Sequence, residues 1–335
     1  MKIRSAGATT PTRIDLAGGT LDIWPICQLI EGAVTVNLAV QLTAQAAVAP
    51  RRGRRLEIRS VDRGRRIVLD LPLARSAFRG PLSWIVRLAH AFAPGVPLTV
   101  TCEAQAPAGA GLGGSSALGI AIGAALARAT GERLTKDALL QRVMNLETRE
   151  IGVPTGNQDY LAALWGGLAA YEHGPDGVVR KRLPHAAALA DRLVLAYTGQ
   201  PRQSGFSNWD MFRRYVEKEK TTTKRMETIA RVARSMRDAL LEGSLDDAGR
   251  LLGEEGRLRY SLAPSVATEA LSRADAAARR AGALGAKVCG AGGGGCLVAF
   301  ARDGRREDVA RAIAGTGASL LPVRVATTGV AVSGS

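Results

Sequence analysis

Residues 107–119 read Pro-Ala-Gly-Ala-Gly-Leu-Gly-Gly-Ser-Ser-Ala-Leu-Gly, between a strand-like apolar run at 98–102 and an alanine-rich helical run at 116–127. Glycine lets the backbone turn through positive φ and leaves no Cβ in the way of a ligand. A glycine-rich loop that ends at a helix start directs free N–H groups and the positive end of the helix dipole at one spot. Ser115 and Ser116 add hydroxyls suited to phosphate oxygens or Mg²⁺. The segment therefore favours a phosphate site over a glycine-rich turn at a close helix–strand contact.

The spacing of this loop differs from two common phosphate-binding patterns. No lysine follows the glycines, so the loop is not the P-loop G-x-x-x-x-G-K-[ST]. Nor is it the G-x-G-x-x-G turn of a dinucleotide-binding unit with an acidic partner. Other segments must therefore decide the chemistry.

A second polar segment lies near the N-terminus. Residues 11–22 read Pro-Thr-Arg-Ile-Asp-Leu-Ala-Gly-Gly-Thr-Leu-Asp, so Arg13, Asp15 and Asp22 surround a Gly-Gly turn. Such a turn fits a loop that faces a ligand, and it fits equally well a surface turn with an internal ion pair. The residues alone leave both interpretations open.

Two carboxylates stand out between 147 and 159. Glu147 lies near the end of an expected helix, where the dipole disfavours negative charge, so either Mg²⁺ or a neighbouring arginine offsets it. The residues alone favour the arginine. Asp159 lies in a polar patch that interrupts apolar sequence, which indicates a semi-buried carboxylate that needs a partner.

Two further segments are rich in glycine and polar residues. Residues 282–296 read Gly-Ala-Leu-Gly-Ala-Lys-Val-Cys-Gly-Ala-Gly-Gly-Gly-Gly-Cys, which suits close approach of the backbone to a ligand or to another loop. Residues 198–204 read Thr-Gly-Gln-Pro-Arg-Gln-Ser and follow an expected strand at 192–197.

These segments together resemble the GHMP kinase superfamily of galactokinase, homoserine kinase, mevalonate kinase and phosphomevalonate kinase. Pro-x-x-x-Gly-Leu-Gly-x-Ser-Ser-Ala resembles its phosphate-binding motif, 11–22 its first motif and 282–296 its C-terminal motif, in family order. Ala-Gly-Gly-x-x-Asp and Thr-Gly-x-x-Arg-x-Ser are closer to the sugar kinase branch of heptose 7-phosphate kinases and fucokinase-like enzymes than to galactokinases. Thr12, where the first motif usually has glycine, and Tyr160, where many relatives have glutamine, are departures.

The resemblance implies a fold and a reaction. The fold would be α/β (α+β), with a ribosomal-S5-like N-terminal domain at 1–170, a ferredoxin-like C-terminal domain at 171–335 and the active site between them. The reaction would transfer the γ-phosphoryl group of ATP, with Mg²⁺, to a hydroxyl of a sugar or sugar phosphate, with a heptose 7-phosphate-like acceptor favoured. The alternatives are a kinase of free galactose or fucose, and a sensor of the same fold that binds without reacting.

The resemblance also implies roles for individual residues. Asp159 would orient or deprotonate the attacking hydroxyl, Arg13 would keep Asp159 ionised, and Ser115 with Glu147 would hold Mg²⁺. The nucleotide phosphates would be bound by Pro107, Gly109, Gly111, Leu112, Gly113, Gly114, Ser115 and Ser116. The acceptor would be bound by Arg13, Gly19, Thr20, Asp22, Asp159, Arg202, Ser204, Gly292 and Gly293, where Arg202 and Ser204 would hold an acceptor phosphate.

Composition narrows the class of protein. The 335 residues are 46% hydrophobic and 22% charged, which is typical of a soluble globular protein. No apolar run reaches the length of a membrane helix, and residues 1–10 do not resemble a secretion signal. The four cysteines are spaced unlike a zinc site, which favours reduced thiols and a cytoplasmic location.

The formal net charge of +15 raises the question of nucleic acid. Arginines cluster at 51–55 and 63–66, around an expected hairpin at 56–60 and 67–70, without aromatic residues for base stacking. We therefore expect a solvated basic surface and neither a nucleic-acid nor a membrane partner. A homodimer is one possible assembly.

The hydrophobic pattern predicts the remaining elements. Strands are expected at 10–16, 34–49 and 98–105. Helices are expected at 83–92, 116–129, 135–150, 207–241, 245–258, 265–280 and 305–314. Residues 297–300 and 320–332 would complete a small α/β sandwich with the last helix.

Overall fold

The computed structural model of the chain describes residues 3–201, 206–262, 266–290 and 292–334. Its strands are β1 (Ala6–Ala17), β2 (Val34–Pro50), β3 (Arg55–Ser60), β4 (Arg65–Asp70), β5 (Leu98–Ala104), β6 (Leu168–Gly174), β7 (Gly177–Arg182), β8 (Leu193–Tyr197), β9 (Ala283–Val288), β10 (Cys296–Ala301), β11 (Ser319–Leu321) and β12 (Ala331–Ser333).

The helices occur singly or in runs between these strands. They are α1 (Ile26–Leu29), the 3₁₀ turn η1 (Arg75–Phe78), α2 (Ser83–Phe92), α3 (Gly114–Thr130), α4 (Lys136–Ile151), α5 (Gln158–Trp165), α6 (Ala186–Ala190), α7 (Phe206–Val216), α8 (Lys220–Glu242), α9 (Leu245–Leu262), α10 (Glu269–Arg280) and α11 (Arg306–Ala314). None of these described helices is long and apolar enough to span a bilayer.

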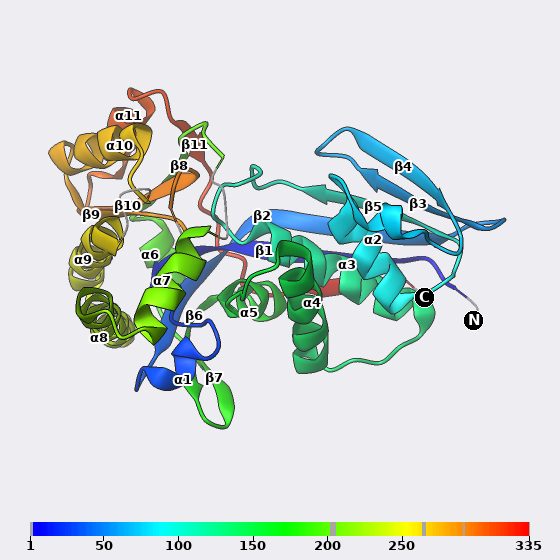
Figure 1. The fold of residues 1–335 in the computed structure, drawn as a ribbon. Helices are drawn as coiled ribbons and strands as arrows, with labels where there is room; N and C mark the ends of the chain where they lie inside the picture. Colours follow the sequence, from blue (N-terminus) through cyan, green and yellow to red (C-terminus); the bar gives the residue numbers. More distant parts are fainter. Residues whose placement is uncertain (1–2, 202–205, 263–265, 291, 335) are drawn as a thin grey trace.

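The N-terminal half is built on a large sheet in the order β12-β1-β2-β5-β3-β4, with β6 paired to β2 and β7 paired to β6. Its pairs are antiparallel except for β3 with β5. Helices α2 to α5 cover one face of this sheet (Figure 1). Helix α3 is almost wholly buried there because its glycines permit close contact: a Cβ on Gly119 would lie 2.8 Å from Trp84.

The C-terminal half is a sandwich around the four-stranded antiparallel sheet β11-β8-β10-β9. Strand β10 is buried on both faces, and successive side chains point to opposite sides. Cys296, Val298 and Phe300 share a core with α8 and α9, whereas Leu297 and Ala299 share another with α10 and α11. The former core also includes apolar residues of β1 and β2, so one continuous core joins the two halves.

Most expected elements are confirmed. Helix α2 spans 83–92, and Thr135 caps α4 by accepting a hydrogen bond from the backbone N–H of Ala138 at 3.1 Å. Helix α3 begins earlier than expected, because Gly113 takes the left-handed N-cap position.

Two expectations about secondary structure are wrong. The helical run expected at 207–241 is two helices, α7 and α8, separated at Lys218, whose φ of +57° is incompatible with a continuous helix. The segment 320–332 was expected in the small sandwich, but only β11 joins the small sheet. Strand β12 returns to the large sheet and pairs Gly7 with Ser333, so both chain ends lie together (Figure 1).

The boundary expected at residue 170 falls inside β6, which pairs with β2. Residues 171–182 and 331–333 therefore add strands to the sheet of the N-terminal half. The division of the chain into domains stays a prediction.

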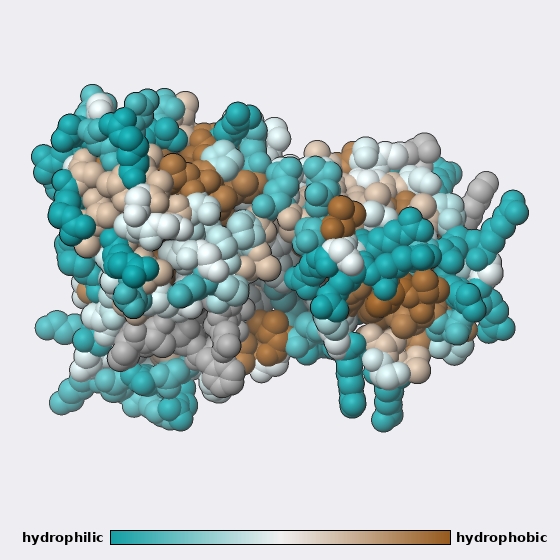
Figure 2. Space-filling model, turned by 90° about the horizontal axis from the view of Figure 1, so that it is seen from above, coloured by the Kyte–Doolittle hydropathy of each residue, from teal (hydrophilic) through white to brown (hydrophobic). Residues whose placement is uncertain are grey.

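The arginine-rich hairpin forms as expected at the end of the large sheet, where the surface is fringed by hydrophilic side chains (Figure 2). Glu57, fully buried on β3, forms ion pairs with Arg51, Arg59 and Arg66. The carboxylate of Glu57 thus neutralises part of the positive charge of this hairpin, in keeping with a solvated basic surface.

Candidate active site

One pocket between the two halves collects most of the residues singled out in the sequence. The glycine-rich loop contributes all of 107–116 to its lining. Arg13, Gly19, Thr20 and Asp22 come from the first motif, and Glu147 and Asp159 come from α4 and α5. Residues from four separate segments of the chain therefore meet around one space.

The glycine-rich loop owes its shape to positive φ angles and to the third motif packed against it. Gly111 and Gly113 have φ of +81° and +73°. A Cβ on Gly111 would lie 2.2 Å from the carbonyl oxygen of Cys289, and one on Gly295 would lie 2.8 Å from that of Ala110. Only glycine fits these contacts. The loop ends at the N-terminus of α3, which is the expected arrangement for an anion site.

Arg13 and Asp159 form a close ion pair in the middle of the pocket. Arg13 is buried on β1, and its Nε and Nη2 lie 2.8 and 2.5 Å from Oδ1 of Asp159. Its Nη1 donates to the carbonyl of Gly111 at 2.6 Å. Burial is the largest single influence and lowers the pKa of Arg13, but the charges of Asp159 and Asp15 together with the hydrogen bond to Asp159 raise that pKa overall. The guanidinium therefore stays charged and fixes Asp159 against the glycine-rich loop.

Glu147 lines the pocket and accepts hydrogen bonds from neighbouring hydroxyl groups. Ser116 Oγ and the Tyr160 hydroxyl donate to its Oε2 at 3.0 and 2.5 Å. Burial raises the pKa of Glu147, and the hydrogen bonds, including one from Ser115, oppose that rise. Among the described residues no arginine pairs with Glu147, contrary to what the residues alone favoured.

The donors around Glu147 suit a magnesium ion that arrives with a nucleotide. Among the described residues, no group of three or more His, Cys, Asp and Glu side chains could hold a metal by itself. Mg²⁺ is commonly held by one or two carboxylates together with substrate phosphates. A buried carboxylate beside serine hydroxyls at a glycine-rich loop that leads into a helix fits that pattern.

The other end of the pocket is formed by the turn at 18–22. Asp22 is buried, and its Oδ2 accepts a hydrogen bond from the backbone N–H of Gln158 at 2.9 Å. A Cβ on Gly156 would lie 2.0 Å from that oxygen. Burial raises the pKa of Asp22 to about 6, with smaller contributions from the charges of Asp159 and Asp15.

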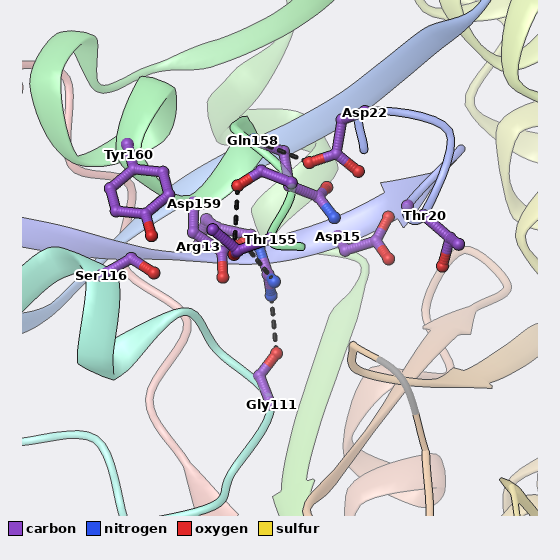
Figure 3. Close-up of polar contacts among 12 residues, drawn as sticks. Arg13, Asp15, Thr20, Asp22, Gly111, Ser116, Thr155, Gln158, Asp159 and Tyr160 are labelled. Carbon is purple, nitrogen blue, oxygen red and sulfur yellow. Dashed lines mark hydrogen bonds and ion pairs between the residues drawn. The ribbon is translucent and has the colours of Figure 1, made fainter. Parts of the chain in front are cut away.

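Figure 3 shows how these groups are arranged. Arg13 and Asp159 lie in the middle, Ser116 and Tyr160 lie on one side, and Thr20 and Asp22 lie on the other. The pocket thus has the glycine-rich loop at one end, an ion pair in its centre and a buried carboxylate at the other end.

Some predicted residues are not brought to this pocket. Gly292 and Gly293 pack against Val266, and among the described residues of that loop Gly290 lines the pocket instead. Arg202 and Ser204 lie outside the described residues.

Sequence reasoning missed several lining residues. Arg259 of α9 reaches the turn at 18–22 from the C-terminal half, and the i, i+4 spacing with Glu255 resembles any surface ion pair. Asp62, Arg63 and Trp84 also line the pocket. Trp84 sits in an ordinary amphipathic helix, so only the folded structure indicates its place.

Known proteins resemble this chain in sequence and in fold. The model of the GHMP kinases N terminal domain matches residues 82–167, and the model of the GHMP kinases C terminal domain matches residues 236–319. A mevalonate kinase of Thermococcus onnurineus is 30% identical over 239 residues, covering 70% of this chain and 69% of that protein.

The chain belongs to the GHMP kinase superfamily.

Solved structures of this superfamily share its fold. A D-glycero-D-manno-heptose 1-phosphate kinase from Bacteroides thetaiotaomicron is 24% identical, with a TM-score of 0.77 over 98% of both chains. A galactokinase from Lactococcus lactis in complex with galactose is 20% identical, with a TM-score of 0.77 over 98% of this chain and 95% of that one. The GHMP kinases are phosphotransferases that use ATP. The acceptor of the phosphoryl group differs among the relatives named here.

Proposed function

We propose that this chain transfers the γ-phosphoryl group of ATP to a hydroxyl of a sugar or sugar phosphate. The observation that carries the proposal is the place of Asp159. Its carboxylate is held by Arg13 in a pocket that has the glycine-rich loop at one end and the buried carboxylate of Asp22 at the other.

The proposed reaction forms a bond between the acceptor oxygen and the γ-phosphorus and breaks the bond from that phosphorus to the β–γ bridging oxygen, which leaves on ADP. Asp159 orients the acceptor hydroxyl and takes its proton. Both contacts from Arg13 end on Oδ1, so Oδ2 is the oxygen assigned to that proton.

Residues 107–116 are assigned to the nucleotide phosphates, through backbone N–H groups and the start of α3. Ser115 and Glu147 are assigned to Mg²⁺, which neutralises phosphate charge when it is bound. Ser116 and Tyr160 hold Glu147 in place by donating to its Oε2. Trp84 and Asp62 are assigned to the end of the pocket that receives the nucleobase.

The acceptor end favours a polyhydroxy compound. Asp22 offers acceptor oxygens in a buried site, which need hydroxyl donors. A carboxylate on the acceptor, as in mevalonate, would instead bring like charges together. The charge of Asp22 therefore supports a sugar as the acceptor. It does so although the mevalonate kinase of Thermococcus onnurineus, at 30% identity, is more similar in sequence than the fucokinase of Arabidopsis thaliana, at 24%.

Whether the sugar is already phosphorylated depends on Arg202 and Ser204 in this proposal. An arginine with hydroxyl neighbours suits a phosphate group. The resemblance of 198–204 to heptose kinases favours a heptose phosphate, and free galactose or fucose is the alternative acceptor.

The proposal is tested by ADP release from ATP and Mg²⁺ over a panel of heptoses, heptose phosphates, galactose, fucose and mevalonate. We expect turnover with at least one sugar or sugar phosphate and none with mevalonate. Turnover with mevalonate alone would overturn the sugar assignment. Binding of both ATP and a sugar by calorimetry without any turnover would favour a sensor.

A further inference from the structure

A buried chain of four charged side chains links the two halves of the molecule beneath the acceptor end. Asp15 comes from β1, Glu255 and Arg259 from α9, and Lys287 from β9. The side chains are at most 3% exposed. Nζ of Lys287 lies 3.1 Å from Oδ2 of Asp15 and 2.9 Å from Oε2 of Glu255. Nε of Arg259 donates to Oε1 of Glu255 at 2.6 Å.

Arg259 extends from this chain into the turn that carries the acceptor residues. Its Nη2 donates to the carbonyl oxygen of Gly19, and its Nη1 lies 3.4 Å from Oγ1 of Thr20. Arg259 and both of these residues line the pocket. A side chain of the C-terminal half thus fixes a loop of the N-terminal half at the point where the acceptor would bind.

The turn needs such support because its backbone is strained. Thr20 has φ of +79°, which a β-branched residue rarely adopts. Strained residues persist only when their surroundings hold them in place, and they cluster at ligand sites. The space is also tight at Gly19, where a Cβ would lie 2.5 Å from Oδ2 of Asp15 and 3.0 Å from Nη2 of Arg259.

The charges argue against a direct role for Arg259 in holding an acceptor phosphate. Two carboxylates, Asp15 and Glu255, share two cations, Arg259 and Lys287, so the chain is neutral as it stands. Burial is the largest single influence and lowers the pKa of Arg259, but the charges of Glu255 and Asp15 together with the hydrogen bond to Glu255 and the charge of Asp22 raise it overall. The positive charge of Arg259 is therefore balanced by carboxylates of the protein itself.

We propose that Arg259 is a positioning residue of the acceptor site. Held by Glu255, it fixes the Gly19 carbonyl and the strained Thr20 so that Thr20 and Asp22 face the acceptor. This inference rests on the proposed phosphoryl transfer and adds that the C-terminal half determines acceptor affinity through α9.

The main test is Arg259→Lys, which keeps the positive charge beside Glu255 but loses the planar fork that reaches two atoms of the turn. The matched control is Arg250→Lys, the same change on an exposed pair with Asp247 in the same helix. Acceptor affinity by calorimetry, kcat, KM for each substrate, and the thermal midpoint are measured for both. We expect the acceptor KM and Kd to rise about tenfold, with a smaller change in kcat and in ATP affinity.

Two further measurements keep the proposal testable if Arg259→Lys does not fold. Glu255→Gln preserves shape and one acceptor for Arg259, and we expect a rise in acceptor KM of roughly threefold with ATP affinity nearly unchanged. In Arg259→Ala, added methylguanidinium should restore part of the acceptor affinity. It should have no such effect on Arg250→Ala.

Unchanged acceptor affinity in a folded Arg259→Lys and in Glu255→Gln would overturn the proposal. A loss confined to phosphorylated acceptors would also overturn it, because that result indicates a direct phosphate contact. If the wild type binds a sugar without turnover, the proposed function fails, yet Arg259→Lys must still weaken sugar binding for this inference to hold.

Discussion

Arg13 contacts a single carboxylate oxygen of Asp159 with two nitrogens, Nε at 2.8 Å and Nη2 at 2.5 Å from Oδ1. The arrangement joins β1 to the first turn of α5 across the pocket. It orients the carboxylate and leaves Oδ2 out of the pair. A group that must accept a proton from a bound hydroxyl benefits from such a division, because one oxygen is fixed and the other serves the acceptor.

Replacing Asp159 by asparagine should therefore reduce kcat far more than it affects binding. The change keeps the shape but removes the proton acceptor, for which losses of about 10²–10⁴-fold are typical. ATP affinity should change little. The matched control is Asp137→Asn, an exposed carboxylate in the first turn of α4. Steady-state kinetics check both variants, and a kcat for Asp159→Asn within a few-fold of wild type would contradict the assigned role.

Gly113→Ala should impair catalysis beyond its effect on stability. The new Cβ would lie 3.0 Å from Cγ of Asp159, and φ at this position is +73°. Gly131→Ala at the other end of α3 is the control, since φ there is +78° but the Cβ meets open space. Both variants should lose about 1–2 kcal/mol of stability from the left-handed backbone. Only Gly113→Ala should also lower kcat. Equal kcat in the two variants would argue against close packing between the loop and Asp159.

Glu147→Gln should raise the Mg²⁺ concentration needed for half-maximal turnover by tenfold or more, in line with the roughly 10–100-fold cost typical of disturbed metal sites. The substitution keeps the size of the side chain and removes the charge that would attract the ion. Glu150→Gln is the control on the same helix, because Glu150 pairs with Arg87. A Mg²⁺ titration of ATP turnover measures both. An unchanged requirement in Glu147→Gln would exclude Glu147 as the metal residue.

Acceptor binding should weaken as the pH falls through about 6, because burial raises the pKa of Asp22 to about 6. Protonation removes the charge with which Asp22 accepts hydrogen bonds from acceptor hydroxyls. The acceptor KM of the wild type should rise below that pH, whereas Asp22→Asn should show a high KM with little dependence on pH in this range. Similar pH profiles for the two proteins would contradict the assignment.

The raised pKa of Asp22 also makes the stability of the fold depend on pH. The pKa of Asp22 in the folded state lies above its ordinary value of 3.8, so the folded state binds the proton more tightly. Its contribution to the free energy of unfolding therefore falls as the pH rises from about 4 to 6, by on the order of 3 kcal/mol. Thermal unfolding should show Asp22→Asn to be stabilised at pH 8 relative to wild type, and not at pH 4.

The sequence predicted best those features that depend on local patterns. The loop at 107–116 is one such feature, because its positive φ angles and close contacts require glycine, and the glycines are visible in the sequence. Thr135 is another, because an N-cap residue is recognisable next to an amphipathic helix. The Arg13–Asp159 pair was predicted only through the resemblance, since nothing in the spacing of two residues 146 positions apart indicates contact.

Features that arise from long-range packing escaped sequence reasoning. Lys287 looks like one charge in an apolar strand, and its burial between Asp15 and Glu255 depends on how β9 meets β1 and α9. The return of β12 to β1 depends equally on tertiary packing. The break at Lys218 was missed because the periodic apolar residues, Met226, Ile229, Val232, Met236 and Leu240, all lie beyond it in α8 and say nothing about the chain before it.

The most direct test of the central claim is to identify the product. Wild type and Asp159→Asn are incubated with ATP, Mg²⁺ and the best acceptor of the panel, and the products are analysed by mass spectrometry and phosphorus NMR. We predict that the wild type forms a new phosphomonoester of the sugar in equal amount to ADP, and that Asp159→Asn forms almost none. Free phosphate with no sugar phosphate, or the same product yield from both proteins, would contradict the account.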